Sequence, residues 1–388
     1  MNKKAILFVV LLTIMPFALK AQNVTIPDLE FKSKLLNHTP VIDTNGDGEI
    51  QITEAELFTQ TLRVSGTSGS PGNITSLEGL EAFINIEGFE GSYNPIETAD
   101  FSENIALRDL VLLETPLSSL NLENNSLLRT VSLSAIQLTS LDFSQNPELL
   151  IVQVTSSPIE SMDLSNCTSL QFLTVFSNQL SSLILWNNTS LVRLNANGNP
   201  LTSINLNNNT ALMELSLRST ALNYLDLSSN PALRQVDLEG SNLLEYLNIK
   251  NGTNENIDIS GGTFSSNFQE LPSLAEVCID DVNSDLAIFI ETQAGHSINF
   301  SQECVLEVAD MEFQNTYLFP NPASNQITLQ STEPIVKAIL FNLLGEKIKT
   351  YQSDAITRIE VQHLQRGTYL LLLEDRLGRI QKEMIIKN

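Results

Sequence analysis

Twelve consecutive residues near the N-terminus carry the oxygen atoms that a divalent cation prefers. They read D-T-N-G-D-G-E-I-Q-I-T-E, from Asp43 to Glu54. The expected ligands are the side chains of Asp43, Asn45, Asp47 and Glu54 and the backbone carbonyl of Glu49. Gly48 stands where the chain needs a sharp turn, and Glu54 at the last position can bind through both oxygens. The spacing predicts a Ca²⁺ site; the alternative is an Asp/Gly turn that holds no metal.

The elements on both sides of this loop must hold it in place. The segment from Asp28, D-L-E-F-K-S-K-L-L-N, has apolar residues at helical spacing: Leu29, Phe31, Leu35 and Leu36. T-E-A-E-L-F-T-Q-T-L after the loop predicts an exiting helix. The whole segment resembles an EF-hand and, as a single hand, a dockerin-like loop. That resemblance implies a structural calcium ion rather than a sensing one.

Little else in the chain has the residues of a reactive site. Three cysteines and three histidines argue against a zinc site and a disulfide-dense scaffold. There is no G-x-S-x-G, no H-E-x-x-H and no glycine-rich phosphate loop. The sequence therefore predicts a protein that is not an enzyme, although spacing alone leaves a paired-carboxylate site open. Cys278 and Cys304 could form a disulfide in an exported protein, or remain two buried thiols.

A repeat of 21 residues dominates the middle of the chain. Its first position falls at Ile86, Leu107, Leu128, Leu149, Leu170, Leu191, Leu212 and Leu233. Each unit contains L-x-x-L-x-L-x-x-N twice, and V-x-L places two apolar side chains on one face of a short strand. The pattern resembles the nested, IRREKO-type class of secreted bacterial leucine-rich-repeat proteins. The resemblance implies a mainly β solenoid in which stacked coils share one core.

Two columns of polar residues follow from the repeat. One reads Asn104, Asn125, Asn146, Cys167, Asn188, Asn209 and Asn230, and a looser one reads Asn94, Thr115, Ile136, Ser157, Asn178, Asn199, Thr220 and Ser241. Asparagine offers donors and an acceptor to the backbone of a turn, so each column predicts a hydrogen-bonded ladder. Cys167 stands in an asparagine position, and we interpret it as structural.

The two strand faces of the repeat differ in their outward residues. The second face is uniform, with serine at 119, 140, 161, 182 and 203 and Asn or Asp at 121, 142, 163, 205 and 226. The first face changes from coil to coil, and its candidate partner-binding residues are Val111, Leu113, Ile151, Phe172, Phe176, Arg193 and Arg218. Phe172 and Phe176 are the expected aromatic anchors. The single tryptophan, Trp186, projects from the second face and is expected to belong to a different patch.

This pattern favours a module that binds a protein or glycan partner through its first face. The alternatives are a structural or adhesion protein in which the solenoid is a spacer, and an accessory to a secreted enzyme. The charge argues against two kinds of anionic partner. The chain carries −24 overall, and the segment between Gln22 and Phe313 carries −29, because both ends are basic. A body that acidic repels nucleic acid and anionic membranes.

Both ends of the chain predict export. Residues 1–21 begin with two lysines, Lys3 and Lys4, followed by an apolar core and then small and polar residues before Gln22, as in a signal peptide; a retained anchor is the alternative. The motifs F-P-N-P-A, N-L-L-G-E-K and L-Q-R-G-T-Y with a lysine-containing end resemble the type A sorting domain of type IX secretion substrates. That resemblance implies recognition by the type IX machinery, removal of the tail, and release or attachment at the cell surface. We expect no transmembrane segment in the mature chain.

The predicted organisation has five parts. They are a signal peptide (1–21), an N-terminal cap (22–80) that contains the loop 43–54, a solenoid (81–250), a C-terminal cap with linker (251–312) and a sorting domain (313–388). Short alternating strands with glycine turns predict an immunoglobulin-like β-sandwich for the last part.

Overall fold

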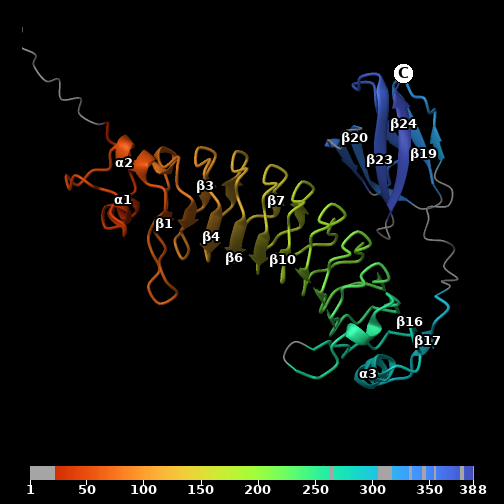
Figure 1. Cartoon of the computed structure of the whole chain (residues 1–388). Coiled ribbons are helices and arrows are strands. Elements are labelled where there is room, and N and C mark those ends of the chain that lie inside the picture. Colours follow the sequence, from red (N-terminus) through yellow and green to blue (C-terminus); the bar gives the residue numbers. More distant parts are fainter. Residues whose placement is uncertain are drawn as a thin grey trace, which may run out of the picture.

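The structure is a computed structural model that describes residues 22–262, 265–304, 317–331, 334–342, 347–353, 355–375 and 380–387. The predicted signal peptide and most of the predicted linker lie outside these residues. In the described part of the chain, short helices come first, a curved stack of coils follows, and a separate β domain comes last (Figure 1). Among the described residues, no helix is long and apolar enough to cross a membrane.

The N-terminal cap has two short helices, α1 (Leu29–Leu36) and α2 (Ile52–Leu57). Phe31 and Leu35 are fully buried, whereas Leu29 is 81% exposed because it lies on the solvent side of the first turn. The prediction of a longer exiting helix is wrong. The chain leaves α2 at Leu57 and forms strand β1 (Thr61–Arg63), which pairs with the first coil and buries Leu62 in the solenoid core.

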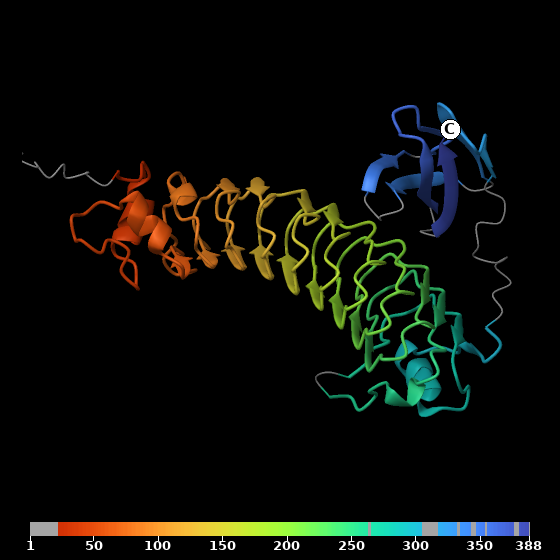
Figure 2. The same ribbon diagram turned by 45° about the horizontal axis from the view of Figure 1, so that its top comes forward.

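One outward face of the solenoid is a nine-stranded parallel sheet. Its strands, in spatial order, are β1, β2 (Gly88–Glu90), β4 (Asp109–Leu113), β6 (Thr130–Ser134), β8 (Ile151–Thr155), β10 (Phe172–Thr174), β11 (Arg193–Asn195), β12 (Glu214–Ser216) and β14 (Gln235–Asp237). From β2 to β14 the register keeps the 21-residue period, so that Ile151, Phe172 and Arg193 are direct neighbours. We call this sheet the first face. It lies along the inner side of the curve (Figure 2).

The opposite side carries shorter parallel sheets, which together form the second face. Their strands are β3 (Thr98–Asp100) with β5 (Ser119–Asn121), β7 (Ser140–Asp142) with β9 (Ser161–Asp163), and then β13 (Tyr224–Asp226), β15 (Tyr246–Asn248), β16 (Glu276–Cys278) and β17 (Asn299–Ser301). The second face therefore continues through Ser301, past the point at which the repeat pattern fades in the sequence. The buried leucines, isoleucines and valines between the two faces form one core.

Helix α3 (Asp285–Ala294) covers the last coils and was not expected from the repeat pattern. Ser284 caps its N-terminus, because the serine hydroxyl accepts a hydrogen bond from the Ala287 N–H. Leu286 and Ile290 are buried against the end of the solenoid core. The helix closes an edge that would otherwise leave strand-like backbone groups exposed.

The asparagine column forms the predicted ladder, but the ladder uses donors alone. Asn125 Nδ2 donates to the carbonyls of Phe101 (2.9 Å) and Asn104 (2.8 Å), and the same arrangement repeats every 21 residues. The buried Oδ1 atoms along this column have no hydrogen-bond partner among the described residues: Asn104, Asn125, Asn146, Asn188, Asn209 and Asn230. The expectation that the side-chain oxygens would also accept is therefore wrong for this column.

A left-handed backbone residue recurs once in each coil, just after the first-face strand. The residues with positive φ include Tyr93, Glu114, Ala135, Ser156, Ser177 and Ser219, with φ between 52° and 57°. Gly198 and Gly240 occupy the same repeat position with φ of 63° and 73°. Glycine adopts this conformation without steric cost, whereas an L-residue does not. The turn thus imposes local strain in most coils.

The C-terminal domain is the predicted β-sandwich. One sheet contains β18 (Tyr317–Phe319), β19 (Gln326–Gln330) and β22 (Arg358–Glu360), and the other contains β21 (Lys347–Gln352), β20 (Ile335–Asn342), β23 (Gly367–Asp375) and β24 (Ile380–Lys387). Its core includes Ala338, Leu340, Leu371 and Leu373 and is separate from that of the solenoid. Both views place this domain on the side of the solenoid that carries the second face.

Candidate functional site

The loop from Asp43 to Glu54 closes on itself through its acidic side chains. Asp43 Oδ1 and Oδ2 accept hydrogen bonds from the backbone N–H groups of Gly46 (2.8 Å) and Gly48 (3.0 Å). Glu54 folds back over the loop, where its Oε1 accepts from the N–H of Thr44 at 2.8 Å. Gly46 and Gly48 both have left-handed φ, of 72° and 80°. The sequence therefore folds this segment into a tight turn lined by carboxylate oxygens.

The remaining predicted ligands fit the same donor set. Asn45 Oδ1 and Asp47 Oδ1 both point into the turn, where they accept from the N–H groups of Asp47 and Glu49 at 2.8 and 2.9 Å. The hydrogen bond from the Glu49 N–H is the main cause that lowers the pKa of Asp47. The Glu49 side chain points away and binds Lys32 at 2.7 Å, which leaves its backbone carbonyl as its contribution to the loop. These oxygens suit a hard cation such as Ca²⁺.

Across the part of the chain that the structure describes, no group of three or more His, Cys, Asp or Glu side chains converges as a metal site. The carboxylates of Asp43, Asp47 and Glu54 are therefore not gathered as such a group, and the predicted donor set also needs the Asn45 amide oxygen and the Glu49 carbonyl.

The first face brings three of its candidate residues together. Ile151, Phe172 and Arg193 are consecutive in one outward column because the strands β8, β10 and β11 pair in register. The Arg193 guanidinium lies 5.6 Å from the centre of the Phe172 ring. It also donates from Nη2 to Glu214 on the next strand at 2.9 Å. An apolar side chain, an aromatic ring and a paired cation thus form a continuous strip across neighbouring coils.

Phe176 and Arg218 lie in a second column, near the ends of the strands. Phe176 is 37% exposed. It follows Phe172 by four residues on the same coil, so their Cα atoms would be about 13 Å apart along an extended chain. Arg218 pairs with Asp237, at 3.7 Å, and with Glu239. Burial raises the pKa of Asp237, although the positive charge of Arg218 opposes that shift.

Val111 and Leu113 are not part of this strip. They lie on β4 and pair with Ser132 and Ser134 of β6, which pair in turn with Gln153 and Thr155 of β8 rather than with Ile151. The apolar candidates on the first face therefore form two areas rather than one. The area around Phe172 also contains the charged pairs, so we take the set Ile151, Phe172, Phe176, Arg193 and Arg218 as the main candidate site and call it the Phe172 area.

The second face carries a contact that the sequence did not suggest. Trp186 packs edge-on against Phe341 of strand β20, with ring centroids 5.8 Å apart and an angle of 84° between the planes. Lys347 of the C-terminal domain forms an ion pair and hydrogen bond with Asp163 of β9. The expectation that Trp186 lies apart from the first-face candidates holds, but its partner is the C-terminal domain.

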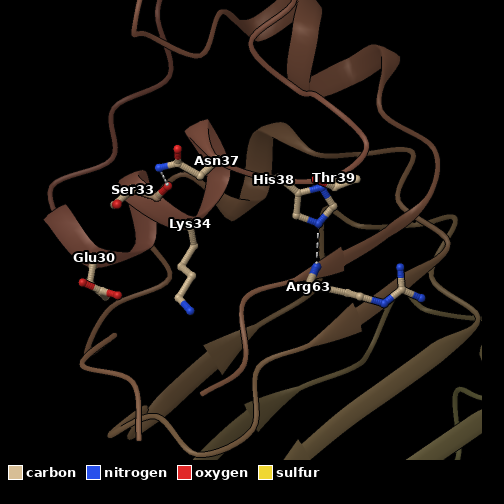
Figure 3. Close-up of a pocket in the computed structure, with 7 residues that line it drawn as sticks. All are labelled: Glu30, Ser33, Lys34, Asn37, His38, Thr39 and Arg63. Carbon is tan, nitrogen blue, oxygen red and sulfur yellow. Dashed lines mark hydrogen bonds between the residues drawn. The ribbon is translucent and has the colours of Figure 1, made fainter. Parts of the chain in front are cut away.

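A hollow of about 460 Å³ lies between α1 and β1, and polar side chains line it (Figure 3). His38 is the residue there that could do chemistry, but both of its ring nitrogens are in use. Nε2 accepts from the Arg63 N–H at 2.9 Å, so Nδ1 carries the proton and donates to the Pro40 carbonyl at 2.9 Å. The histidine joins α1 to β1 and has a structural role.

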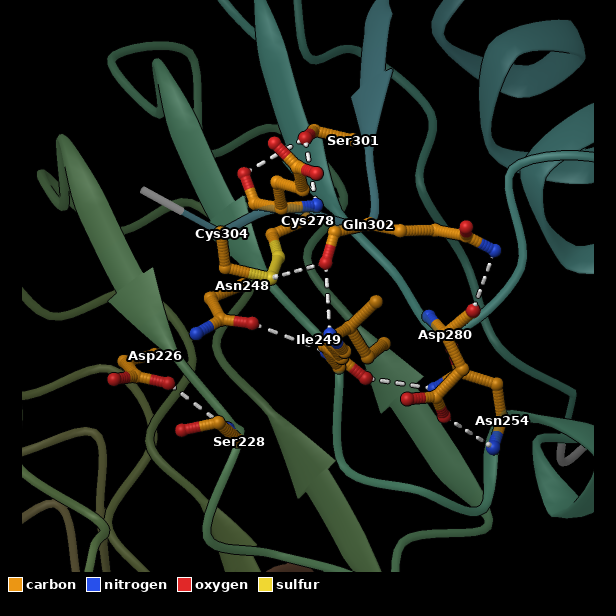
Figure 4. The surroundings of a disulfide bond; sticks show 12 residues. Asp226, Ser228, Asn248, Ile249, Asn254, Cys278, Asp280, Ser301, Gln302 and Cys304 are labelled. Carbon is orange, nitrogen blue, oxygen red and sulfur yellow. Dashed lines mark hydrogen bonds between the residues drawn. A yellow bond between two sulfur atoms is a disulfide. The ribbon is translucent and has the colours of Figure 1, made fainter. Parts of the chain in front are cut away.

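A disulfide joins Cys278 and Cys304 at the C-terminal end of the second face, with Cα atoms 5.4 Å apart (Figure 4). Asp280 lies beside it and accepts from the backbone N–H groups of Gly252 (3.1 Å) and Asn254 (3.2 Å). The third cysteine, Cys167, is buried and free. Its Sγ lies 3.4 Å from the Phe143 carbonyl and 3.7 Å from that of Asn146, in the place of an asparagine amide.

Comparison with known proteins identifies the C-terminal domain. Residues 317–387 match the family described as the secretion system C-terminal sorting domain. This match confirms the predicted sorting tail and places the protein outside the cell or at the cell surface. No curated protein matches the chain.

Several solved structures resemble the solenoid at low identity. A complex of TLR13 with ssRNA13 has a TM-score of 0.43 and 17% identity over 53% of this chain and 34% of that chain, so this protein corresponds to about a third of it. The internalin InlF of Listeria monocytogenes has a TM-score of 0.35 and 16% identity over 73% of this chain and 98% of its own. The functional domain of InlJ from Listeria monocytogenes has a TM-score of 0.32 and 15% identity over 95% and 98%.

Proposed function

We propose that the mature protein is a non-catalytic binding module that acts outside the cell and recognises a protein partner with the Phe172 area of its first face. The observation that carries this proposal is the contrast between the faces. From Ser119 to Asn205 the second face repeats serine with Asn or Asp in every coil except the one that contains Ile184, whereas the Phe172 area combines an aliphatic residue, two aromatic rings and two arginines. Aromatic residues and arginine are the types enriched at the centres of protein interfaces.

The geometry of the first face supports a protein partner over a glycan. The strip from Ile151 to Arg193 crosses three strands of a parallel sheet. Strands 4.7–4.9 Å apart give nine of them a surface roughly 40 Å long, which is enough for an interface of standard size. Arg193 and Arg218 are already paired with acidic neighbours, so less side-chain entropy is lost when a partner binds.

The experiment that tests the proposal uses the full chain as bait for extracellular and cell-surface proteins. The variant Phe172→Ser with Phe176→Ser removes both rings, and Ile105→Ser removes an apolar side chain that is 55% exposed outside the first-face columns. A protein that is captured by the wild type and by Ile105→Ser, and lost with the double variant, supports the proposal. Equal capture by all three forms overturns it.

Three further roles predict different results for the same variants. If the ligand is a glycan, the wild type binds an array of polysaccharides and loses that binding with the double variant. If the solenoid is a spacer in a structural or adhesion protein, neither ring affects any binding. An accessory to a secreted enzyme would be captured together with that enzyme.

We also propose that the loop from Asp43 to Glu54 binds one Ca²⁺ ion with a structural role. The donors would be Asp43, Asn45, Asp47 and Glu54 together with the Glu49 carbonyl. The loop connects α1 to α2, and α2 leads directly into β1 at the edge of the first face. A bound cation would draw the loop carboxylates together and neutralise their charge, and would fix the cap on the first coil.

A further inference from the structure

Between Asp100 and Asn248 the second face loses its regular pattern at one coil. In the other coils of this stretch an Asn or Asp accepts a hydrogen bond from the backbone N–H two residues later, which caps the turn after the strand. These capping residues are Asp100, Asn121, Asp142, Asp163, Asn205, Asp226 and Asn248. The coil between Asp163 and Asn205 has Ile184 at this position, and isoleucine has no acceptor.

The same coil breaks the next column as well. Trp186 stands where Glu123, Ser144, Ser165, Asn207 and Ser228 stand in other coils. Among the coils that contain the residues from Glu123 to Ser228, only this coil has apolar residues at these two positions. Solenoid packing does not require either change, because both side chains point away from the core and the neighbouring coils fold with polar residues there. An apolar pair on an otherwise polar surface indicates a contact.

The C-terminal domain supplies the other half of this contact. Its strand β20 alternates, so that Ala338 and Leu340 face the domain core while Ile339 and Phe341 face outward. Leu372 on β23 pairs with Ile339 and shares that outward face. Phe341 and Leu372 are nevertheless buried, at 4% and 5% exposure, although neither belongs to the core of the domain.

These outward apolar residues meet the irregular coil. The Phe341 ring contacts Trp186 edge-on. One small hollow at the junction is lined by residues of both parts, namely Ile184, Trp186, Lys337, Ile339, Leu372, Leu373 and Glu374. This contact between the second face and the C-terminal domain explains why Ile184 and Trp186 replace polar residues. It also explains why the outer face of β20 is apolar.

An ion pair lies beside the apolar contact. Asp163 is in the coil before Trp186, and it binds Lys347 of β21 through Oδ2 while its Oδ1 keeps the cap on Ser165. Burial raises the pKa of Asp163, but the hydrogen bonds from Lys347 and Ser165 outweigh that effect and lower it. Opposite charges at the edge of an apolar contact fix its orientation and disfavour other arrangements.

We propose that Ile184, Trp186 and Asp163 form a docking site for the sorting domain of the same chain, so that the unprocessed protein carries its tail folded onto the second face. The docked tail covers an apolar patch on the solenoid, and the solenoid in turn covers the outer face of β20. Separation of the two parts exposes Trp186 on one and Phe341 on the other. The first face remains open while the tail is docked, because the tail lies on the opposite side.

The experiment uses the intrinsic fluorescence of the full chain, since Trp186 is its one tryptophan. Asp163→Lys places two cations together and should release the tail, which shifts Trp186 emission to longer wavelength and increases quenching by acrylamide. Lys347→Asp should have the same effect. The double variant, Asp163→Lys with Lys347→Asp, restores the pair with reversed charges and should return emission and quenching towards the wild-type values.

Matched controls separate docking from local damage. Asp142→Lys removes the equivalent cap one coil earlier, in which Asp142 accepts a hydrogen bond from the Ser144 N–H. Asp142 is not part of the contact with the tail, so this variant should leave the emission and quenching of Trp186 unchanged. Phe341→Glu should release the tail, and it should leave the core of the tail intact because Phe341 is not part of that core. Met384→Glu, at a site 64% exposed, should leave the tail docked. Circular dichroism confirms that each variant is folded.

The proposal is overturned if Asp163→Lys, Lys347→Asp and Phe341→Glu all leave the emission and quenching of Trp186 unchanged. A protease site inserted between Cys304 and Tyr317 allows the tail to be cleaved and the two fragments to be separated. The proposal is also overturned if this separation leaves the emission and quenching of Trp186 unchanged. Neither readout depends on the partner of the first face, so this test is independent of the proposed function.

Discussion

The Arg193 guanidinium lies over the ring of Phe172 on the inner face of the solenoid, 5.6 Å from its centre. The two residues are 21 positions apart in the chain and adjacent in space, because each coil of the repeat contributes one strand in register. Glu214 on the following strand holds the other side of the guanidinium. Such a cation–aromatic contact is worth about 0.5–1 kcal/mol at an exposed site, so its value here lies mainly in orienting two side chains that a partner can use.

Cys167 should be unreactive in the folded protein. Burial raises the pKa of its thiol to about 12, so almost no thiolate is present at neutral pH. With the disulfide between Cys278 and Cys304 intact, a thiol reagent such as DTNB should label no site in the native chain and one site after denaturation. Fast labelling of the native chain would contradict the assigned burial.

The variant Cys167→Asn should stabilise the solenoid. The neighbouring ladder positions use two N–H donors each, whereas a thiol has one weak donor. Restoring amide donors should raise the free energy of unfolding by about 1 kcal/mol, measured by chemical denaturation. Asn146→Cys is the reciprocal change and should lower it. A destabilised Cys167→Asn variant would show that the cavity at this coil is too small for an amide.

The left-handed turn predicts opposite effects for two small substitutions. Ala135→Gly removes a Cβ from a residue with φ of 52°, and Gly198→Ala adds one at φ of 63°. The first should stabilise the protein and the second should destabilise it, each by about 1 kcal/mol. Thermal melting of both variants checks the prediction. Equal shifts in the same direction would contradict it.

Calcium should raise the melting temperature of the full chain, and a chelator should reverse the effect. Ligand at about 100 times its dissociation constant adds about 2.7 kcal/mol to stability. Glu54→Gln should abolish most of the calcium response because it removes the bidentate carboxylate. Glu49→Gln is the matched control and should keep the response, since the Glu49 side chain binds Lys32 and only its backbone carbonyl faces the loop. No calcium response in the wild type would refute the site.

Asp28 should make stability depend on pH in the acid range. Burial alone would raise its pKa, but hydrogen bonds from Phe31, Thr75 and Ser76 outweigh burial and hold the pKa below 3.8. The folded state therefore binds this proton less readily than the unfolded state, so the stabilisation is complete above pH 3.8 and is lost as the pH falls through the folded value.

Asp28→Asn isolates that contribution. Asparagine still caps helix α1, but it cannot provide the second carboxylate oxygen that accepts from Thr75 and Ser76. At neutral pH the variant should be less stable by about 1 kcal/mol, because the carboxylate is partly exposed to solvent. The difference should shrink as the pH is lowered below 3.8. A difference that stays constant from pH 7 to pH 2 would contradict the assigned role.

The parts of the fold that the sequence predicted best depend on local repetition. Leu107, Leu128 and the equivalent leucines recur without a slip, and a stacked coil is the arrangement that buries them together. The polar ladder and the sandwich tail follow from similar short-range patterns. The ends of the solenoid were less predictable. Helix α2 ends at Leu57, and the chain then forms strand β1, which buries Leu62 in the solenoid core. Helix α3 lies where the repeat pattern has already faded.

The candidate site was only partly predictable for a related reason. The column spacing of the repeat predicts that Phe172 and Arg193 are neighbours. It does not show that Arg193 is already paired with Glu214, because the direction of a side chain depends on its contacts. The contact between Trp186 and Phe341 joins residues 155 positions apart in two domains, and no periodicity connects them. The available signals in the sequence were Ile184 and Trp186, which replace polar residues in two neighbouring columns.

The most direct test of the central claim is the dissociation constant of the captured partner for four forms of the full chain. Phe172→Ser and Arg193→Ala should each weaken binding by about tenfold or more, which corresponds to about 1.4 kcal/mol or more. Their melting temperatures should remain close to that of the wild type, because both side chains lie on the surface. Ile105→Ser should bind as the wild type does. Unchanged dissociation constants in Phe172→Ser and Arg193→Ala would contradict recognition through the first face.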